Sequence, residues 1–176
     1  MNNGVGLVLL IGLFGAVVFT GAAIAAWWME PKERVARLVR RGLAGPPEVL
    51  SVAPARGQGA ALAINEGRLA VVRGPGDAGL VYDLDELVGA ELIFDGQVAA
   101  RIFRGEPRRA LDQISPQVSR VILRFAFDDP HDPEFEFELY APTDAGRRDD
   151  LGPDAAVVMA RRWFARLEAV LRRSRD

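Results

Sequence analysis

The feature that most constrains this chain is an apolar run from Gly4 to Met29 that contains no charged side chain. A hydrocarbon core about 30 Å thick is spanned by roughly 20 apolar residues in a helix, because a helix satisfies its own backbone hydrogen bonds. The run is long enough, and Trp27 and Trp28 lie where interfacial aromatic side chains are found. The sequence therefore predicts a transmembrane helix over residues 4–29.

A cleaved signal peptide is the alternative interpretation of this run. Ala23, Ile24 and Ala25 form a passable small-residue cleavage pattern. The run lacks a basic segment before it, however, and it is longer than the apolar region of a usual signal peptide. The pattern favours an anchor.

Basic residues follow the apolar run and do not precede it. Residues 30–43 carry a local charge of +3, residues 154–176 also carry +3, and the segment between them carries −8. Because positive residues beside a span stay in the cytoplasm, we expect the rest of the chain on the cytoplasmic side. Only one of the 22 basic residues is a lysine, which is typical of a GC-rich bacterial genome, so the expected location is a bacterial inner membrane. With the two tryptophans, the expected membrane interface comprises Trp27, Trp28, Lys32, Arg34, Arg37, Arg40 and Arg41.

The segment 30–46 is predicted to be a basic juxtamembrane helix followed by a linker. Val35, Leu38, Val39 and Leu43 form an apolar stripe at helical spacing, and arginines occupy the other faces. Two interpretations stay open: a helix lying on an anionic membrane surface, or a topology signal with a frayed helix. Glycines and prolines over 42–47 then mark a boundary, so the globular domain is expected over residues 47–176.

A ridge of small side chains recurs within the apolar run at Gly12, Ala16 and Thr20. Such a ridge allows two membrane helices to approach closely, so it is a candidate contact for a homo-oligomer. Glycine and alanine are also frequent in membrane helices that do not associate.

From residue 48 to residue 140 the pattern is that of β-structure. Apolar runs separated by turn signals predict strands over residues 49–53, 60–64, 68–73, 80–83, 88–94 and 97–104. Asp95-Gly96 is the strongest hairpin signal. Residues 105–116 are expected to be a polar connection.

Two further segments, 120–127 and 134–140, show a period-two pattern in which large apolar residues occupy every second position. Each strand therefore has one face toward a core and one toward water. If the two pair with matching faces, Arg124 lies opposite Glu136 or Glu138 on the outer face.

The chain closes with a predicted amphipathic helix that starts near Pro153. Its apolar stripe comprises Val157, Ala160, Phe164, Leu167 and Leu171. A helix of this kind must bury its stripe, and the apolar face of the sheet is the obvious place. The expected fold class is α+β: an N-terminal transmembrane helix, then about seven antiparallel strands in a barrel or sheet, capped by this helix.

That order of elements, with the segments 81–92 and 163–168 in particular, resembles bacterial membrane-anchored members of the pleckstrin-homology-like superfold. The resemblance covers roughly residues 47–173 and implies a binding or scaffolding role. The basic pocket of the lipid-binding members is not evident, since the first hairpin offers only Arg68 and Arg73. A closed calycin-like barrel is the structural alternative.

Few residues point to catalysis or to metal binding. His131 stands among Asp128, Asp129 and Asp132, which could ligate a metal, but a polar, proline-rich loop between paired strands is the favoured interpretation. Asp83, Asp85 and Glu86 lack the remaining ligands of a calcium loop. The chain has no cysteine, no nucleophile motif around its serines and no phosphate-binding glycine motif. We therefore expect no cofactor, no metal and no enzymatic activity.

The partners expected from the sequence are a lipid bilayer and an unknown protein. A basic terminal helix contains Arg161, Arg162, Arg166, Arg172, Arg173 and Arg175. The negative charge of the domain's body argues against nucleic acid. The leading hypothesis is a membrane-tethered binding or scaffold module for protein–protein interaction, and the alternatives are an anionic-lipid head-group sensor and, after it, an unrecognised enzyme.

Overall fold

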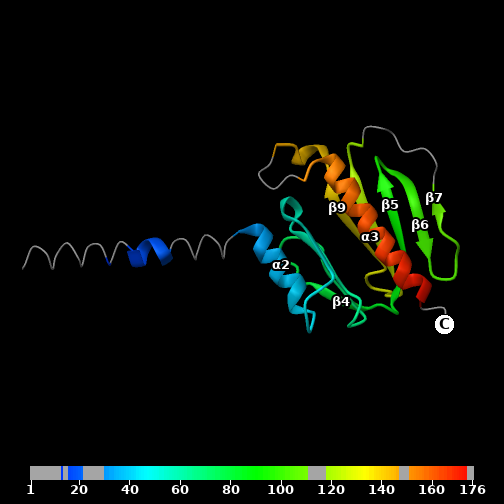
Figure 1. Ribbon diagram of the computed structural model, residues 1–176, viewed down its shortest axis with the longest axis horizontal. Coiled ribbons are helices and arrows are strands. Elements are labelled where there is room, and N and C mark those ends of the chain that lie inside the picture. Colours follow the sequence, from blue (N-terminus) through cyan, green and yellow to red (C-terminus); the bar gives the residue numbers. More distant parts are fainter. Residues whose placement is uncertain (1–12, 14–15, 22–29, 111–117, 147–150, 174–176) are drawn as a thin grey trace, which may run out of the picture.

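The computed structural model describes residues 13, 16–21, 30–110, 118–146 and 151–173. Within these residues the chain forms two antiparallel sheets and two packed helices (Figure 1). The first sheet has the order β1-β2-β3-β4, and the second has the order β7-β6-β5-β8-β9. The strands of the first sheet are β1 (Val49–Ala53), β2 (Gln58–Ala63), β3 (Arg68–Val72) and β4 (Leu80–Asp83). Those of the second are β5 (Leu87–Phe94), β6 (Gln97–Phe103), β7 (Arg109–Ala110), β8 (Val121–Phe127) and β9 (Glu134–Tyr140). The helices are α2 (Pro31–Arg41) and α3 (Pro153–Arg173), with short 3₁₀ turns η1 (Pro54–Arg56) and η2 (Pro142–Asp144).

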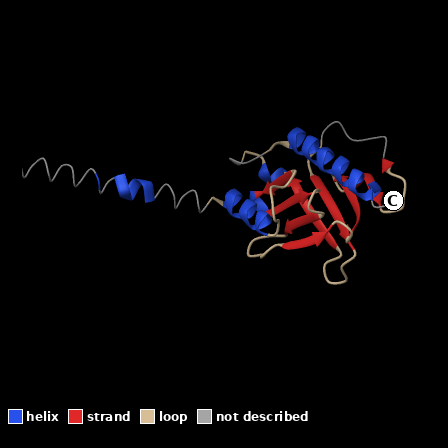
Figure 2. Cartoon of the chain, turned by 60° about the horizontal axis from the view of Figure 1, so that its bottom comes forward, coloured by secondary structure: helices blue, strands red, loops and turns tan. Residues whose placement is uncertain are grey.

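The main core is enclosed by the two sheets and α3. Figure 2 shows α3 lying across the strands. Trp163 of α3 is fully buried and meets the ring of Phe125 edge to face, with 5.8 Å between ring centroids. Ala160, Phe164, Leu167 and Leu171 are buried beside it. The prediction that the terminal stripe closes the apolar face of a sheet is therefore confirmed.

A second, smaller core lies on the opposite face of the first sheet. There α2 buries Val35 and Val39 against Ala61, Ala70 and Val72. Gly59 of β2 lets this helix approach closely, because a Cβ at that position would lie 2.8 Å from both valine side chains. The apolar stripe of segment 30–46 thus packs on protein, and four of its five basic side chains are exposed.

The prediction of a transmembrane helix over residues 4–29 conflicts with the structure. Most of that segment lies outside the described residues, which include only residue 13 and residues 16–21 of it. Among the helices that the structure describes, none is both long enough and apolar enough to cross a bilayer. The physical reason is plain for each packed helix: α2 has 11 residues, and α3 has 21 but carries arginines along its length. The single-pass membrane architecture is therefore not supported.

The expectation of a barrel is also wrong, because the strands form two open sheets rather than a closed cylinder. In the part of the chain that is described, β4 and β7 each pair on one side only. The outer edge of β9 is covered differently: the amide of Gln58 donates to the carbonyl of Glu136 and accepts from the N–H of Glu138. This side chain takes the place of a neighbouring strand and blocks a reactive edge.

The strand predictions hold well in position and in register. The β1, β4 and β9 segments begin and end where the sequence pattern placed them. Arg124 lies opposite Glu136 on the face turned away from Phe125, with Nη2–Oε1 at 2.6 Å. Glu91 of β5 adds a second partner at 2.8 Å. The two-residue strand β7 was not predicted and lies within the expected polar connection.

Candidate protein-binding groove

The candidate functional site is a groove between α3 and the β6–β7 side of the second sheet. Its volume is about 330 Å³. Its lining comprises Leu92, Ala99, Ala100, Arg108, Ala110, Arg161, Phe164 and Ala165. In Figure 1, α3 crosses the second sheet obliquely, and β6 and β7 lie to one side of it.

Small side chains hollow out the floor of this groove. Leu92 pairs with Ala100 on the face of the sheet that turns toward α3. Ala99 and Ala100 are both buried, yet each fills only the space of a methyl group. On the helix side, Ala165 is exposed beside the buried ring of Phe164. Larger residues at these positions would fill the groove, so its depth follows directly from the alanines.

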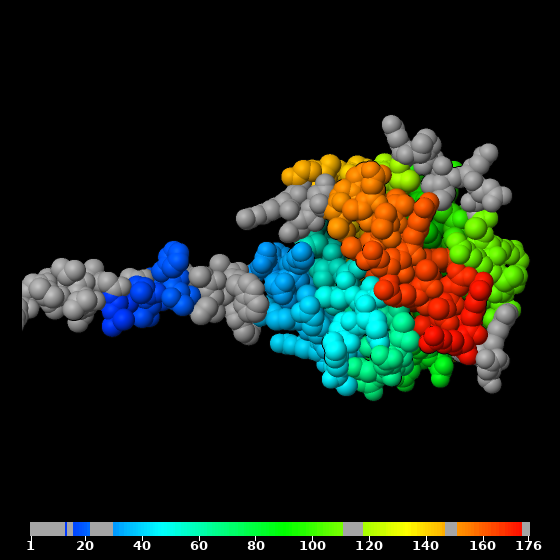
Figure 3. Space-filling view, in the orientation of Figure 1, coloured from blue at the N-terminus to red at the C-terminus, as the bar shows by residue number. Residues whose placement is uncertain are grey.

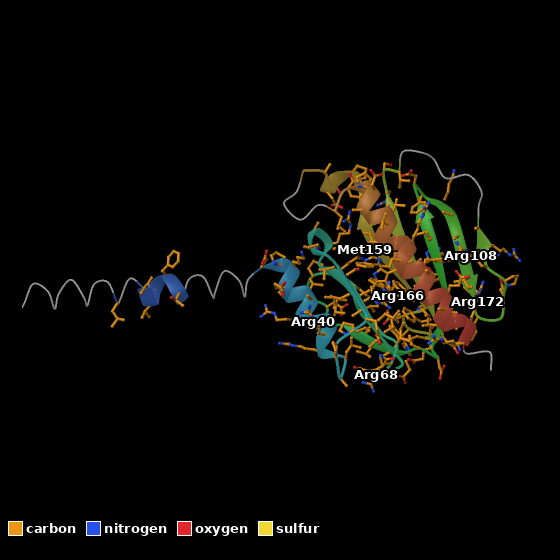
Figure 4. All side chains as sticks on the ribbon, viewed as in Figure 1. Arg40, Arg68, Arg108, Met159, Arg166 and Arg172 are labelled. Atoms are coloured by element: carbon orange, nitrogen blue, oxygen red, sulfur yellow. The ribbon has the colours of Figure 1, made fainter. Side chains whose placement is uncertain are left out.

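Arg108 crosses one end of the groove, and the side chains of Figure 4 show it across from α3. Its guanidinium carbon lies 5.5 Å from the centroid of the Phe164 ring, in cation–π range. Its Nη1 lies 3.1 Å from Oε2 of Glu168. The other oxygen of Glu168 binds Nη2 of Arg172 at 2.6 Å. One carboxylate therefore bridges two arginines at the groove's end.

Arg161 stands on the other part of the helix wall. Within the described residues, its side chain makes no ion pair, so its positive charge is available to a ligand. The groove thus combines an apolar floor with positively charged walls.

The groove also borders an incompletely paired strand. In the described part, β7 pairs with β6 at only two positions, Ala100↔Ala110 and Arg101↔Arg109. β7 is the edge strand of the second sheet in the described part of the chain, and its outer side pairs with no described strand. Such an edge can take up an extended segment by strand addition.

Two other hollows are less suited to ligand binding. One, of about 470 Å³, lies between η2 and the β5–β6 turn. Its charges are already paired: Glu138 binds both Arg56 and Arg120, and Arg56 also binds Asp144 at 2.8 Å. Burial lowers the pKa of Arg56, but its hydrogen bonds to Asp144 and Glu138 outweigh that and raise the pKa above its ordinary value. This network joins the two sheets and acts structurally.

The other hollow, of about 170 Å³, lies between α2 and the loops at 54–57 and 74–76. Prolines and glycines line most of it, and Arg34 is its single charged lining residue. It offers few polar groups with which to orient a ligand.

The residues predicted at the membrane interface and in the helix ridge are only partly described. Trp27, Trp28 and Gly12 lie outside the described residues. Ala16 and Thr20 belong to a helical stretch, and the Thr20 hydroxyl donates to the Ala16 carbonyl at 2.8 Å, so the two lie one turn apart. On α2, four of the predicted basic residues are exposed: Lys32, Arg34, Arg40 and Arg41. Arg37 is half-buried and its Nε donates to the Glu33 carbonyl at 3.2 Å. The structure does not bring the described ones among these residues to the groove.

The acidic loop around His131 does not form a compact ligand set. The imidazole is 92% exposed, and Asp132 is engaged by Arg73 at 2.6 Å. Among the described residues, no group of three or more metal-ligating side chains converges. Arg73 follows β3 and also donates to the hydroxyl of Tyr82 in β4, at 3.1 Å. Its ion pair with Asp132 therefore joins the loop between β8 and β9 to the first sheet.

Sequence reasoning placed Phe164 on the buried stripe and Arg161 on the basic helix, but it missed the groove. The missing part is β7 with Arg108, which the sequence showed as a polar connection. A weak signal was present: two adjacent alanines, Ala99 and Ala100, interrupt an otherwise large-residue strand pattern. Alanine at a core-facing strand position leaves space above it.

Comparison with known proteins adds no assignment. No protein-family model, no curated protein and no solved structure matches this chain. The geometry of the groove is therefore the basis on which function is considered.

Proposed function

We propose that this protein is a protein-binding module and that the α3/β6–β7 groove receives an extended segment of a partner protein. The observation that carries the proposal is the juxtaposition of an alanine floor, two arginines and the edge strand β7. An extended chain can hydrogen-bond to a strand edge while alternate side chains enter a groove beside it.

The composition of the groove supports a protein segment over a small-molecule substrate. Its volume is at the lower end of the range of about 300–1,000 Å³ for small-molecule sites. Among the described residues, the ionisable groups in its lining are two arginines, whereas proton transfer in enzymes most often uses histidine or carboxylate side chains. Apolar side chains flanked by acidic residues complement it best.

A matched pair of substitutions on α3 tests the proposal. Ala165 is exposed and lines the groove, whereas Ala169, four residues further on, is exposed outside it. We expect Ala165→Trp to block the groove and Ala169→Trp to leave it open. The probe is a fluorescein-labelled peptide in which valine alternates with glutamate, titrated into the full chain by fluorescence anisotropy. Binding lost in Ala165→Trp and kept in Ala169→Trp supports the proposal; equal binding in both variants contradicts it.

Anionic-lipid binding is a second candidate function, favoured by the exposed basic side chains of α2. Because the apolar stripe of α2 is buried, the attraction would be electrostatic, at about 1 kcal/mol for each basic residue near the surface. The comparison is between vesicles with and without phosphatidylserine. A phosphatidylserine preference that is lost in Arg40→Gln/Arg41→Gln supports lipid sensing, and a preference unchanged in that variant opposes it.

A further inference from the structure

We infer that the groove selects an acidic partner segment by carboxylate exchange: a partner carboxylate replaces Glu168 on Arg108, and Glu168 stays bound to Arg172. This rests on the proposed function and specifies its ligand. The two oxygens of Glu168 are used separately, Oε2 by Arg108 at 3.1 Å and Oε1 by Arg172 at 2.6 Å. Either arginine can therefore dissociate from Glu168 while the other stays bound to it.

Burial explains why the second arginine matters. The side chain of Glu168 is 13% exposed, whereas those of Arg108 and Arg172 are 47% and 61% exposed. A largely buried carboxylate without a partner is costly, so Glu168 holds Arg108 firmly unless another cation satisfies it. Arg172, four residues further along the same helix, is that cation. It lowers the free energy needed to release Arg108.

Position explains why Arg108 is the residue released. It lines the groove directly and lies over the ring of Phe164, whereas Arg172 does not belong to the lining. A carboxylate entering the groove meets the half-exposed guanidinium of Arg108 directly, and Glu168 then remains bound to Arg172. Glu168 thus acts as an internal competitor for the ligand, and Arg108 determines specificity for negative charge.

The test measures the affinity of the full chain for two probe peptides, valine alternating with glutamate and valine alternating with glutamine. Removing the competitor in Glu168→Gln should tighten binding of the glutamate probe by about two- to fivefold, the equivalent of a partly exposed ion pair. Arg172→Gln should weaken it by a similar factor, since Glu168 then depends on Arg108 alone. In the double variant the effect of Arg172→Gln should vanish, because residues in one network are not additive. Arg108→Met should reduce the preference for the glutamate probe to the part that Arg161 supplies.

The glutamine probe is the internal control for folding of the groove. Its affinity should be unchanged in Glu168→Gln and Arg172→Gln. Equal affinity of the glutamate probe in the wild-type chain and in Glu168→Gln, with the glutamine probe still bound, overturns the exchange and leaves the groove's function intact. If neither probe binds the wild-type chain, the proposed function itself fails.

Discussion

The indole Nε1–H of Trp163 donates a 2.8 Å hydrogen bond to the hydroxyl of Ser51, and this bond fixes the last helix to the first strand. Both residues are buried, at 0% and 4% exposure. The same hydroxyl donates to the sulfur of Met159 at 3.2 Å. Since α3 forms one wall of the groove, the packing that orients α3 also shapes the groove. Figure 3 shows α3 (orange to red) beside the part of the chain that carries the first sheet (cyan to green).

Ser51→Ala should destabilise the fold by leaving the Trp163 N–H buried without an acceptor. We expect a cost of about 1–3 kcal/mol, the penalty of one unsatisfied buried donor. Gln97→Ala is the comparison, because that polar side chain is exposed. Urea denaturation of both variants measures the difference; a Ser51→Ala midpoint equal to that of the wild type would show that the bond contributes nothing.

Phe164→Ala tests the packing of α3 on the second sheet. The ring is 2% exposed, so its removal leaves a cavity and should cost about 3–5 kcal/mol. Arg162→Ala on the exposed side of the same helix should change stability by no more than about 0.5 kcal/mol. Near-equal denaturation midpoints for the two variants would reject the capping role of the helix.

Much of this fold could be predicted because large apolar residues at every second position leave a strand only one face that can be buried. In β8 and β9, a shift of one residue would turn every phenylalanine to water, so the pairing of Arg124 with Glu136 follows from the pattern. The position of α2 could not be derived in that way. Its stripe of Val35 and Val39 would suit a membrane surface or a sheet equally well, and only the complementary glycine at position 59 decides between them. The groove depends on β7, and a strand of two residues is too short to show a periodic pattern of apolar residues in the sequence.

Gly59→Ala tests the docking of α2 on the first sheet. The added methyl group would lie 2.8 Å from Val35 Cγ1 and Val39 Cγ2, so the helix or its side chains must shift. Overpacking of this kind costs about 1–3 kcal/mol. Gly74→Ala is the matched control, since the atom nearest to its added methyl is 3.9 Å away. A normal denaturation midpoint in Gly59→Ala would contradict the tight docking of α2.

Asp95 should make stability depend on pH in the acidic range. Hydrogen bonds from the Ser119 hydroxyl and N–H, and from the Arg120 N–H, outweigh partial burial and hold the pKa of Asp95 below its ordinary value of 3.8. Because the pKa of Asp95 is lower in the folded state, the ionised carboxylate stabilises the fold at pH values above its ordinary pKa. This contribution is lost as the pH falls through the pKa of Asp95 in the folded state. The denaturation midpoint should therefore fall on acidification below 3.8.

Asp95→Asn should reduce that fall while keeping the turn. Asp95 has a φ of 50°, and asparagine tolerates this left-handed conformation well. Midpoints measured at neutral pH and at about pH 3 should differ less in Asp95→Asn than in the wild-type chain. If the midpoint differs by the same amount between the two pH values in both proteins, Asp95 does not contribute to the pH dependence.

The most direct test of the central claim is to locate the ligand by NMR. The ¹⁵N-labelled full chain is titrated with the valine–glutamate peptide, and amide chemical-shift changes are mapped on the structure. We predict that the largest changes fall on β6, on β7 and on residues 161–168 of α3, and that Ala165→Trp abolishes them. Changes confined to α2, or no saturable changes at all, would contradict the assignment of the groove as the binding site.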